Sequence, residues 1–117
     1  MSKSGIALAR AAENRAALDA EARGWIVLGR NVRVGRDELD LVALDGTVLV
    51  IVEVRARSNV RDGHPLESVS RAKADRLRRA AIRYAAEHGA LEIRIDVVSV
   101  VDDELSWIEN AVDFTQT

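Results

Sequence analysis

The sequence predicts an α/β fold in which helices flank a mixed β-sheet, with the element order α-β-β-β-α-β. Two segments rich in Ala and charged residues carry apolar side chains at helical spacing, and the segments between and after them have the aliphatic composition of strands. The second helical segment is long enough to cross over the sheet, so the strands before and after it are expected to be parallel neighbours. With 117 residues, the chain is expected to form a single domain over residues 1–117.

The first expected element is a helix over residues 4–23, because this segment is rich in Ala and charge and stops before Gly24, a residue typical of helix C-termini. At 100° per residue, its inward stripe consists of Ile6, Ala9, Ala16, Ala17 and Ala20. Glu13 falls near the centre of that stripe, so a carboxylate is expected to face inward. The alternative is that Glu13 caps the structure locally or pairs with an arginine.

Three strands are expected next, and the last two form a hairpin. Residues 25–30 form the first strand, and residues 38–44 and 48–57 are joined by an Asp-Gly pair at 45–46, which is typical of a tight antiparallel turn. The second arm of the hairpin is apolar on both faces until Glu53, which predicts a central strand covered by helices. Glu53 therefore interrupts a core strand.

Polar residues at 58–65 predict a loop, and a second helix is expected over residues 67–88, closed by Gly89. The inward stripe of this helix consists of Val69, Leu77, Ala80, Ala81 and Tyr84, and Lys73 lies within it.

Two further strands complete the expected sheet. Residues 91–101 have strand composition, and residues 105–112 are expected to add a short edge strand. Asp96 interrupts the first of these strands, where we expect it to fix a local hydrogen bond rather than bind a metal.

The composition restricts the chemistry that this chain can perform. It has no Cys and two His, which excludes disulfides and thiolate zinc sites and nearly excludes Ser-His-Asp catalysis. Catalysis would have to use the 19 carboxylates and 17 basic groups. The longest aliphatic run is far shorter than a membrane span, and the first residues lack the apolar centre of a signal peptide. We therefore expect a cytoplasmic protein without a membrane partner.

The candidate site combines acidic residues from the hairpin and the first helix. Glu53 and Arg55 are two residues apart on one strand, so their side chains share a face, and the hairpin can bring Asp40 alongside them. Carboxylates at such apolar positions are costly unless a shared cation neutralises them, and Mg²⁺ accepts such ligands. The alternative is a structural ion pair between Glu53 and Arg55, with Asp40 paired to another arginine.

Basic residues are concentrated in the middle of the chain. Residues 55–83 contain nine basic side chains and three acidic ones, although the whole chain has a net charge of −2. Arg76, Arg79 and Arg83 recur at helical spacing on one face of the second helix. This pattern fits contact with phosphates, and the alternative is an ordinary solvated helix face.

Three motifs resemble those of the bacterial YraN family of endonuclease-like proteins. They are GWIVLGRN at 24–31, DELDL at 37–41 and VIVEVRAR at 50–57, against the family patterns G-Y-x-I-L-x-R-N, G-E-I-D-L-I and V-F-V-E-V-K-x-R. The likeness continues through the second helix to the strand around Asp96 and covers essentially the whole chain. It implies the restriction-endonuclease-like PD-(D/E)XK fold, whose core has the element order predicted above.

The resemblance also implies a divalent-metal site and a DNA substrate. Asp40 and Glu53 match the metal-binding acidic pair, the carbonyl of Val54 is the expected third ligand, and Glu13 matches a glutamate that often completes such sites. Glu38 is a further candidate. The implied cofactor is Mg²⁺ or Mn²⁺, and the implied partner is double-stranded or branched DNA. The phosphate-binding candidates are Arg57, Arg71, Arg76, Arg79 and Arg83.

Two positions depart from the family pattern. Asp37 replaces a Gly, and Arg55 replaces the lysine that normally helps to activate the attacking water. Arginine supplies charge but, because a guanidinium holds its proton far more tightly than an ammonium group, it is hardly a proton acceptor. Lys73 is one of only two lysines in the chain, and one hypothesis is that it acts as a substitute from the second helix. The alternative is that its side chain extends past the edge of the sheet to solvent.

Three functions follow as hypotheses. The first is a Mg²⁺-dependent DNA endonuclease in which Asp40 and Glu53 hold the ion, Arg55 and Lys73 act at the phosphate, and the arginines hold the DNA backbone. The second is a catalytically impaired nucleic-acid-binding protein that retains the nuclease fold. The third is a structural dimerising domain. A homodimer also fits the first hypothesis, because two copies would cut both strands.

Overall fold

The computed structural model describes residues 2–57, 69–90, 92–102 and 104–113. These residues form two helices and five strands, with the bounds α1 Ser2–Ala22, β1 Ile26–Val34, β2 Asp37–Asp45, β3 Val48–Arg57, α2 Arg71–His88, β4 Glu92–Val101 and β5 Glu104–Ile108. The predicted element order is confirmed. The last strand is shorter than the expected 105–112, and the loop expected at 58–65 lies outside the described residues.

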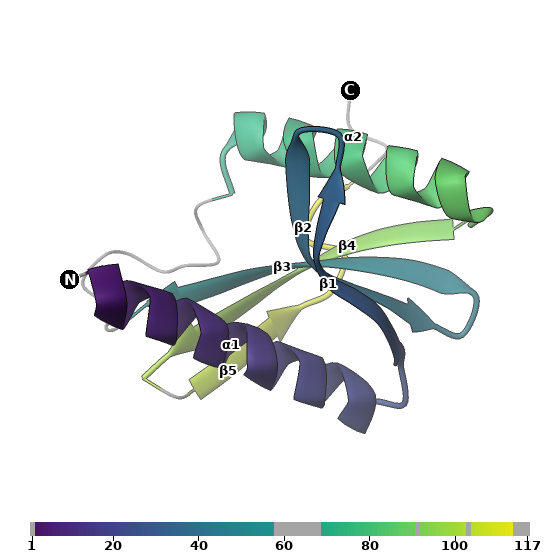
Figure 1. The fold of residues 1–117 in the computed structure, drawn as a ribbon. Helices are drawn as coiled ribbons and strands as arrows, with labels where there is room; N and C mark the ends of the chain where they lie inside the picture. Colours follow the sequence, from purple (N-terminus) through teal and green to yellow (C-terminus); the bar gives the residue numbers. More distant parts are fainter. Residues whose placement is uncertain (1, 58–68, 91, 103, 114–117) are drawn as a thin grey trace.

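The strands form one mixed sheet in the order β1-β2-β3-β4-β5. β3 and β4 are parallel and are joined through α2, as predicted, whereas the other neighbouring strands are antiparallel. α1 and α2 lie on opposite faces of the sheet (Figure 1). The predicted sheet flanked by helices is therefore confirmed, and β3, which carries Glu53, is its central strand.

Local sequence signals set several of the element ends. Gly46 has φ 60° in the β2–β3 turn and Gly89 has φ 70° after α2, a conformation that costs glycine little. α2 begins at Arg71 rather than at the predicted residue 67. The reason is a helix cap: Ser70 is extended, and its Oγ accepts a hydrogen bond of 3.1 Å from the backbone N–H of Lys73.

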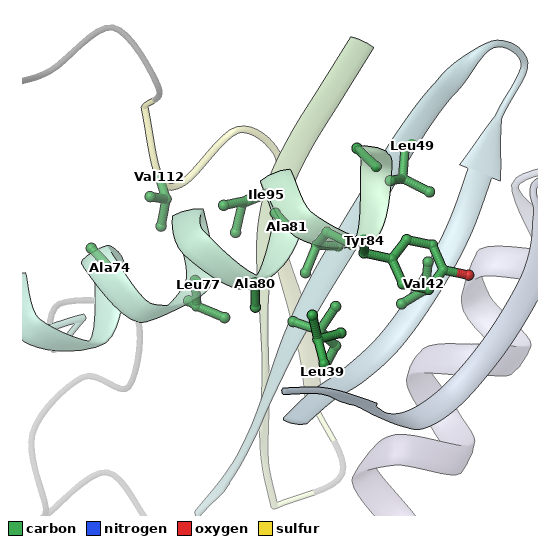
Figure 2. Close-up of a cluster of buried hydrophobic side chains, with 13 residues drawn as sticks. Leu39, Val42, Leu49, Ala74, Leu77, Ala80, Ala81, Tyr84, Ile95 and Val112 are labelled. Carbon is green, nitrogen blue, oxygen red and sulfur yellow. The ribbon is translucent and has the colours of Figure 1, made fainter. Parts of the chain in front are cut away.

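The face of the sheet toward α2 carries a large aliphatic cluster. Figure 2 shows Leu77, Ala80, Ala81 and Tyr84 of the helix directed at the strands. Val69, which was predicted to face inward with them, is partly buried against the same cluster. The strand residues in contact are Leu39, Val42, Leu49, Ile51 and Ile95. Burial of these side chains fixes α2, and therefore Lys73, relative to β3.

The opposite face is covered by small residues of α1. Its buried residues are Ala12, Ala16, Ala17 and Ala20, packed on Leu41, Ala43, Val50, Val52 and Val98. The small alanine side chains allow the helix to approach the sheet closely. The prediction that Ile6 and Ala9 face inward was wrong, since both are exposed. They line open hollows at the start of α1 instead of resting on the sheet core.

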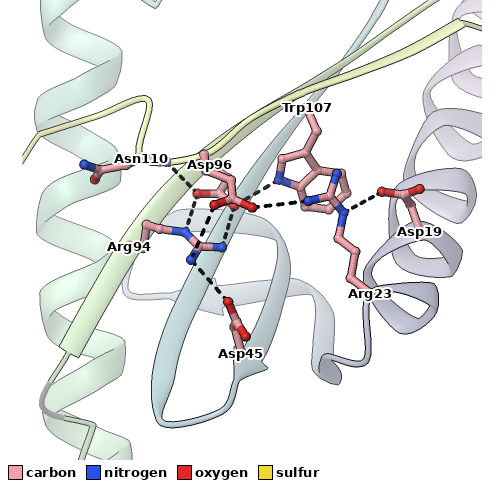
Figure 3. Close-up of polar contacts among 8 residues, drawn as sticks. Asp19, Arg23, Asp45, Arg94, Asp96, Trp107 and Asn110 are labelled. Atoms are coloured by element: carbon pink, nitrogen blue, oxygen red, sulfur yellow. Dashed lines mark hydrogen bonds and ion pairs between the residues drawn. The ribbon is translucent and has the colours of Figure 1, made fainter.

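A buried polar network joins β4 to β5. Asp96 is fully buried and accepts two hydrogen bonds from the Arg94 guanidinium, one from Trp107 Nε1 and one from the backbone N–H of Asn110 (Figure 3). Arg94 also pairs with Asp45. Asp96 thus has the structural role expected from the sequence, because its charge is balanced and its oxygens have donors.

Candidate active site

Asp40 lies at the point where β2 separates from β3. The β2–β3 ladder ends at the pair Leu41 and Val52, so the backbone of Asp40 does not continue it. The side chain bridges the gap instead, because Asp40 Oδ2 accepts a hydrogen bond of 2.9 Å from the backbone N–H of Val54. The carboxylate of Asp40 is therefore held against the end of β3.

Glu53 is the acidic partner of Asp40. Its side chain is on the α2 side of β3, like that of Ile51 two residues before it, and is 9% exposed. Lys73 Nζ lies 3.1 Å from Glu53 Oε2, and the backbone N–H of Lys73 is held by Ser70 at the start of α2. The structure thus brings together Asp40, Glu53 and Lys73, three of the four predicted catalytic residues.

The fourth, Arg55, lies two residues beyond Glu53 on the same strand. Arg55 and Glu53 line one open hollow of about 720 Å³, together with Val54, Ala56, Ser70, Lys73, Gly5, Leu8 and Ala9. Strand parity predicts that Glu53 and Arg55 share a face of β3. Glu53, the partner of Asp40, is therefore open to a molecule approaching between the start of α1 and the start of α2.

The electrostatics of Asp40 differ from those of an ordinary carboxylate. Burial raises its pKa from the usual 3.8 to about 7, and the negative charges of Glu53 and, more weakly, Glu13 act in the same direction. The hydrogen bond from Val54 opposes this rise only partly. When two carboxylates lie this close together, a bound cation stabilises their ionised forms because it offsets the repulsion between their charges.

The donor set fits a hard divalent ion. Mg²⁺ commonly takes one or two carboxylates and completes its shell with water, and Asp40, Glu53 and the Val54 carbonyl supply oxygens. Among the described residues, no three His, Cys, Asp or Glu side chains converge as a metal cluster. Glu13 stands beside the pair, with Oε1 3.3 Å from the amide Nδ2 of Asn31. Glu13 stays a predicted ligand.

The predicted phosphate-binding arginines fall into two groups. Arg71 and Arg76 are exposed and make no ion pair within the described part of the chain. Arg79 instead forms a two-pronged pair with Asp37, with Nη2–Oδ2 3.0 Å and Nε–Oδ2 3.3 Å. Asp37, which replaces the Gly of the family pattern, thus pairs with Arg79, and this ion pair connects the start of β2 to α2.

Arg83 and Arg57 complete the set. Arg83 reaches the same β1–β2 turn, since a Cβ added at Gly35 would lie 2.6 Å from its Nη1, and it pairs loosely with Glu87 at 3.8 Å. The side chain of Arg57 lies outside the described residues. Phosphate binding by these residues stays a prediction.

Sequence reasoning missed the role of residues on β1, which extends to Val34 instead of ending at 30. A second hollow, of about 450 Å³, is lined by Ile6, Ala9, Arg10, Glu13, Asn14, Arg30 and Asn31. Arg30 Nη2 donates to Asn14 Oδ1 at 2.6 Å, so β1 and α1 are joined by polar contacts. Arg30 and Asn31 end the family-like motif at 24–31, but the sequence alone could not predict that they contact α1.

Comparison with known proteins identifies the family of this chain. Residues 12–100 match the model of the uncharacterised protein family UPF0102. The chain belongs to this family. The UPF0102 protein of Beutenbergia cavernae is 55% identical over 83 residues, which cover 69% of this chain and 70% of that protein. The UPF0102 protein of Renibacterium salmoninarum is 46% identical over 98 residues, or 82% of this chain and 83% of that protein. The UPF0102 family is the YraN family, so the resemblance seen in the sequence motifs is confirmed.

The UPF0102 chain also shares its fold with a solved nuclease structure. The Holliday junction resolvase Hjc of Archaeoglobus fulgidus matches with a TM-score of 0.55 and 18% identity, over 83% of this chain and 72% of that chain. The predicted restriction-endonuclease-like fold is therefore confirmed. In the described part of the chain, no helix is long and apolar enough to cross a bilayer.

Proposed function

We propose that this UPF0102 protein is a divalent-metal-dependent DNA endonuclease of the cytoplasm. The observation that carries the proposal is the acidic pair Asp40–Glu53, in which Glu53 is paired with Lys73 and lines a hollow between two helices. A strongly raised pKa, as at Asp40, beside a charged partner that lines a hollow is typical of functional sites. The shared fold with a Holliday junction resolvase supports a nuclease, with branched DNA as the first substrate to examine.

Asp40, Glu53 and the Val54 carbonyl would hold the ion, with Glu13 beside them. A bound Mg²⁺ or Mn²⁺ would polarise the scissile phosphate and lower the pKa of an attacking water. Lys73, anchored at 3.1 Å from Glu53, would orient that water and offset the negative charge of the carboxylates. Arg55 would stabilise the charge of the pentavalent phosphate, because its guanidinium stays cationic throughout.

Exposed arginines would hold the DNA on either side of this centre. Arg71 and Arg76 belong to the first turns of α2, the helix that also carries Lys73. Lone arginines facing solvent contribute to binding by releasing counterions from the phosphate backbone. A homodimer is part of the proposal, because the edge strand β1 exposes Ile26 and Leu28 and a second copy would allow cutting of both strands.

Cleavage of four-way junction, flap and linear DNA in Mg²⁺ or Mn²⁺ tests the proposal. We expect the wild type and the control Glu92→Gln, an exposed carboxylate on β4, to cut at least one substrate. Asp40→Asn and Glu53→Gln should lose at least about 100-fold of the rate, since each removes a charged ligand while keeping the side-chain shape. Cutting that persists in both variants would contradict the assignment.

A second candidate function is nucleic-acid binding without cleavage. The observation in its favour is Arg55 at the position of the family lysine, which removes one proton acceptor from the site. Salt-sensitive DNA binding by the wild type, with no cutting in either metal and no change in Asp40→Asn, would support this function over the first.

A further inference from the structure

Asn31 interrupts β1 with an unusual backbone conformation. It lies inside the strand Ile26–Val34 and has φ 51°, in the left-handed region. Residues with a side chain rarely adopt this conformation, and Asn is one of the few that tolerate it. A strand residue of this kind changes the direction of the chain instead of extending it.

The side chains of both β1 and β2 change face of the sheet at this point. On β2, Leu39 packs in the α2 cluster and Leu41 in the α1 cluster, although residues two apart on a strand normally share a face. On β1, Arg30 bonds to Asn14 of α1, whereas Val32 packs against the α2 cluster. The pairs on either side are Arg30–Leu41 and Val32–Leu39, so the crease lies at Asn31 and Asp40.

The crease has two consequences for the acidic site. First, β2 leaves β3 at Asp40, and the Asp40 carboxylate becomes the acceptor for the Val54 N–H. Second, the side-chain amide of Asn31 points to α1 and donates to Glu13 at 3.3 Å. One residue therefore shapes the strand that carries Asp40 and contacts Glu13 directly.

We propose that Asn31 is a positioning residue of the acidic site. Its left-handed backbone directs the Asp40 carboxylate onto β3, and its amide orients Glu13 toward the pair. The metal-binding part of this inference rests on the proposed function, whereas the placement of Asp40 does not.

Three variants separate the backbone role from the amide role. Asn31→Ala removes the amide and disfavours the left-handed conformation, whereas Asn31→Gly removes only the amide. Asn110→Ala is the matched control, because Asn110 also has a left-handed φ of 54° but lies in the turn after β5, where its backbone N–H contacts Asp96. The control has the same backbone cost away from Asp40.

The first readout is amide hydrogen exchange at Val54 in metal-free protein, followed by NMR. We expect Asn31→Ala to exchange about tenfold faster at Val54 than the wild type, and Asn31→Gly and Asn110→Ala to stay near the wild type. The second readout is Mn²⁺ affinity by calorimetry. It should fall about tenfold in Asn31→Ala, by a smaller factor in Asn31→Gly, and stay unchanged in Asn110→Ala.

Wild-type exchange at Val54 in Asn31→Ala, or equal acceleration in Asn31→Ala and Asn31→Gly, overturns the proposal. Equal acceleration in Asn110→Ala also overturns it, because the effect would then be one of general stability. If the wild type binds no Mn²⁺, the metal proposal fails, while the exchange data still decide whether Asn31 positions Asp40.

Discussion

Asp96 and Asp40 are two carboxylates withdrawn from solvent in one sheet, and their surroundings are opposite. Asp96 accepts four hydrogen bonds, two of them from a guanidinium, and raises the pKa of that Arg94 further. Asp40 has one backbone donor and two acidic neighbours, and its pKa rises to about 7. Burial of a carboxylate therefore does not by itself mark a site. What distinguishes Asp40 is that the carboxylates Glu53 and Glu13 act on it and raise its pKa, whereas Asp96 is paired with a guanidinium.

The largest expected effect comes from removing the carboxylate of Asp96, whose oxygens accept four hydrogen bonds. Asp96→Ala leaves Arg94, Trp107 and the Asn110 N–H without their shared acceptor, so the free energy of unfolding should fall by about 3 kcal/mol. Urea denaturation measures this loss. A change below about 1 kcal/mol would mean that the network contributes little to stability and that the contrast with Asp40 is overstated.

The next effect concerns the pH dependence of stability at Asp40, the carboxylate with acidic neighbours. The pKa of Asp40 is higher in the folded protein than in the unfolded chain, so its contribution to stability is present below about 4 and is lost as pH rises through about 7. The free energy of unfolding of metal-free wild type, minus that of Asp40→Asn, should fall between pH 5 and 7 with a slope approaching about 1.4 kcal/mol per pH unit. Urea titrations at several pH values give this difference, and a flat difference would show that Asp40 ionises normally.

The smallest effect extends the comparison to arginines. Arg76→Ala and Arg79→Ala remove the same charge from one face of α2, but only Arg79 is engaged by Asp37. Arg76→Ala should weaken duplex binding a few-fold and reduce the salt slope by about 1. Arg79→Ala should weaken binding less and instead lower the free energy of unfolding by about 0.5 kcal/mol, because this ion pair is half-exposed. Fluorescence anisotropy at several salt concentrations separates the two, and equal losses of affinity would contradict the distinction.

The sequence predicted those features that depend on local chemistry. The Asp-Gly turn at 45–46 and Gly89 after the second helix follow from backbone preferences, and the parallel pairing of β3 with β4 follows from the helix between them. Strand parity indicated that Glu53 and Arg55 share a face. The family-like motifs then singled out Asp40 and Glu53 as a pair.

The features that the sequence did not predict depend on how distant segments meet. The prediction that one stripe of α1 is buried was correct at Ala16 and wrong at Ile6. Helical periodicity shows which residues share a face, but it does not show where the sheet beneath that face ends. The Arg79–Asp37 pair joins residues 42 apart in sequence, and the crease at Asn31 appears only when the registers of β1 and β2 are known. No sequence signal pointed to that crease, because the predicted first strand ended at residue 30, before Asn31.

Mn²⁺ binding, measured by calorimetry at pH 6 and pH 8, tests the central claim that Asp40 and Glu53 form a cation site. We predict one tight site in the wild type, bound more tightly at pH 8, with release of a proton at pH 6 because the ion displaces it from Asp40. Asp40→Asn should lose most of this affinity and the proton release, whereas Glu92→Gln should keep both. Absence of binding in the wild type, or equal affinity and proton release in Asp40→Asn, would contradict the account.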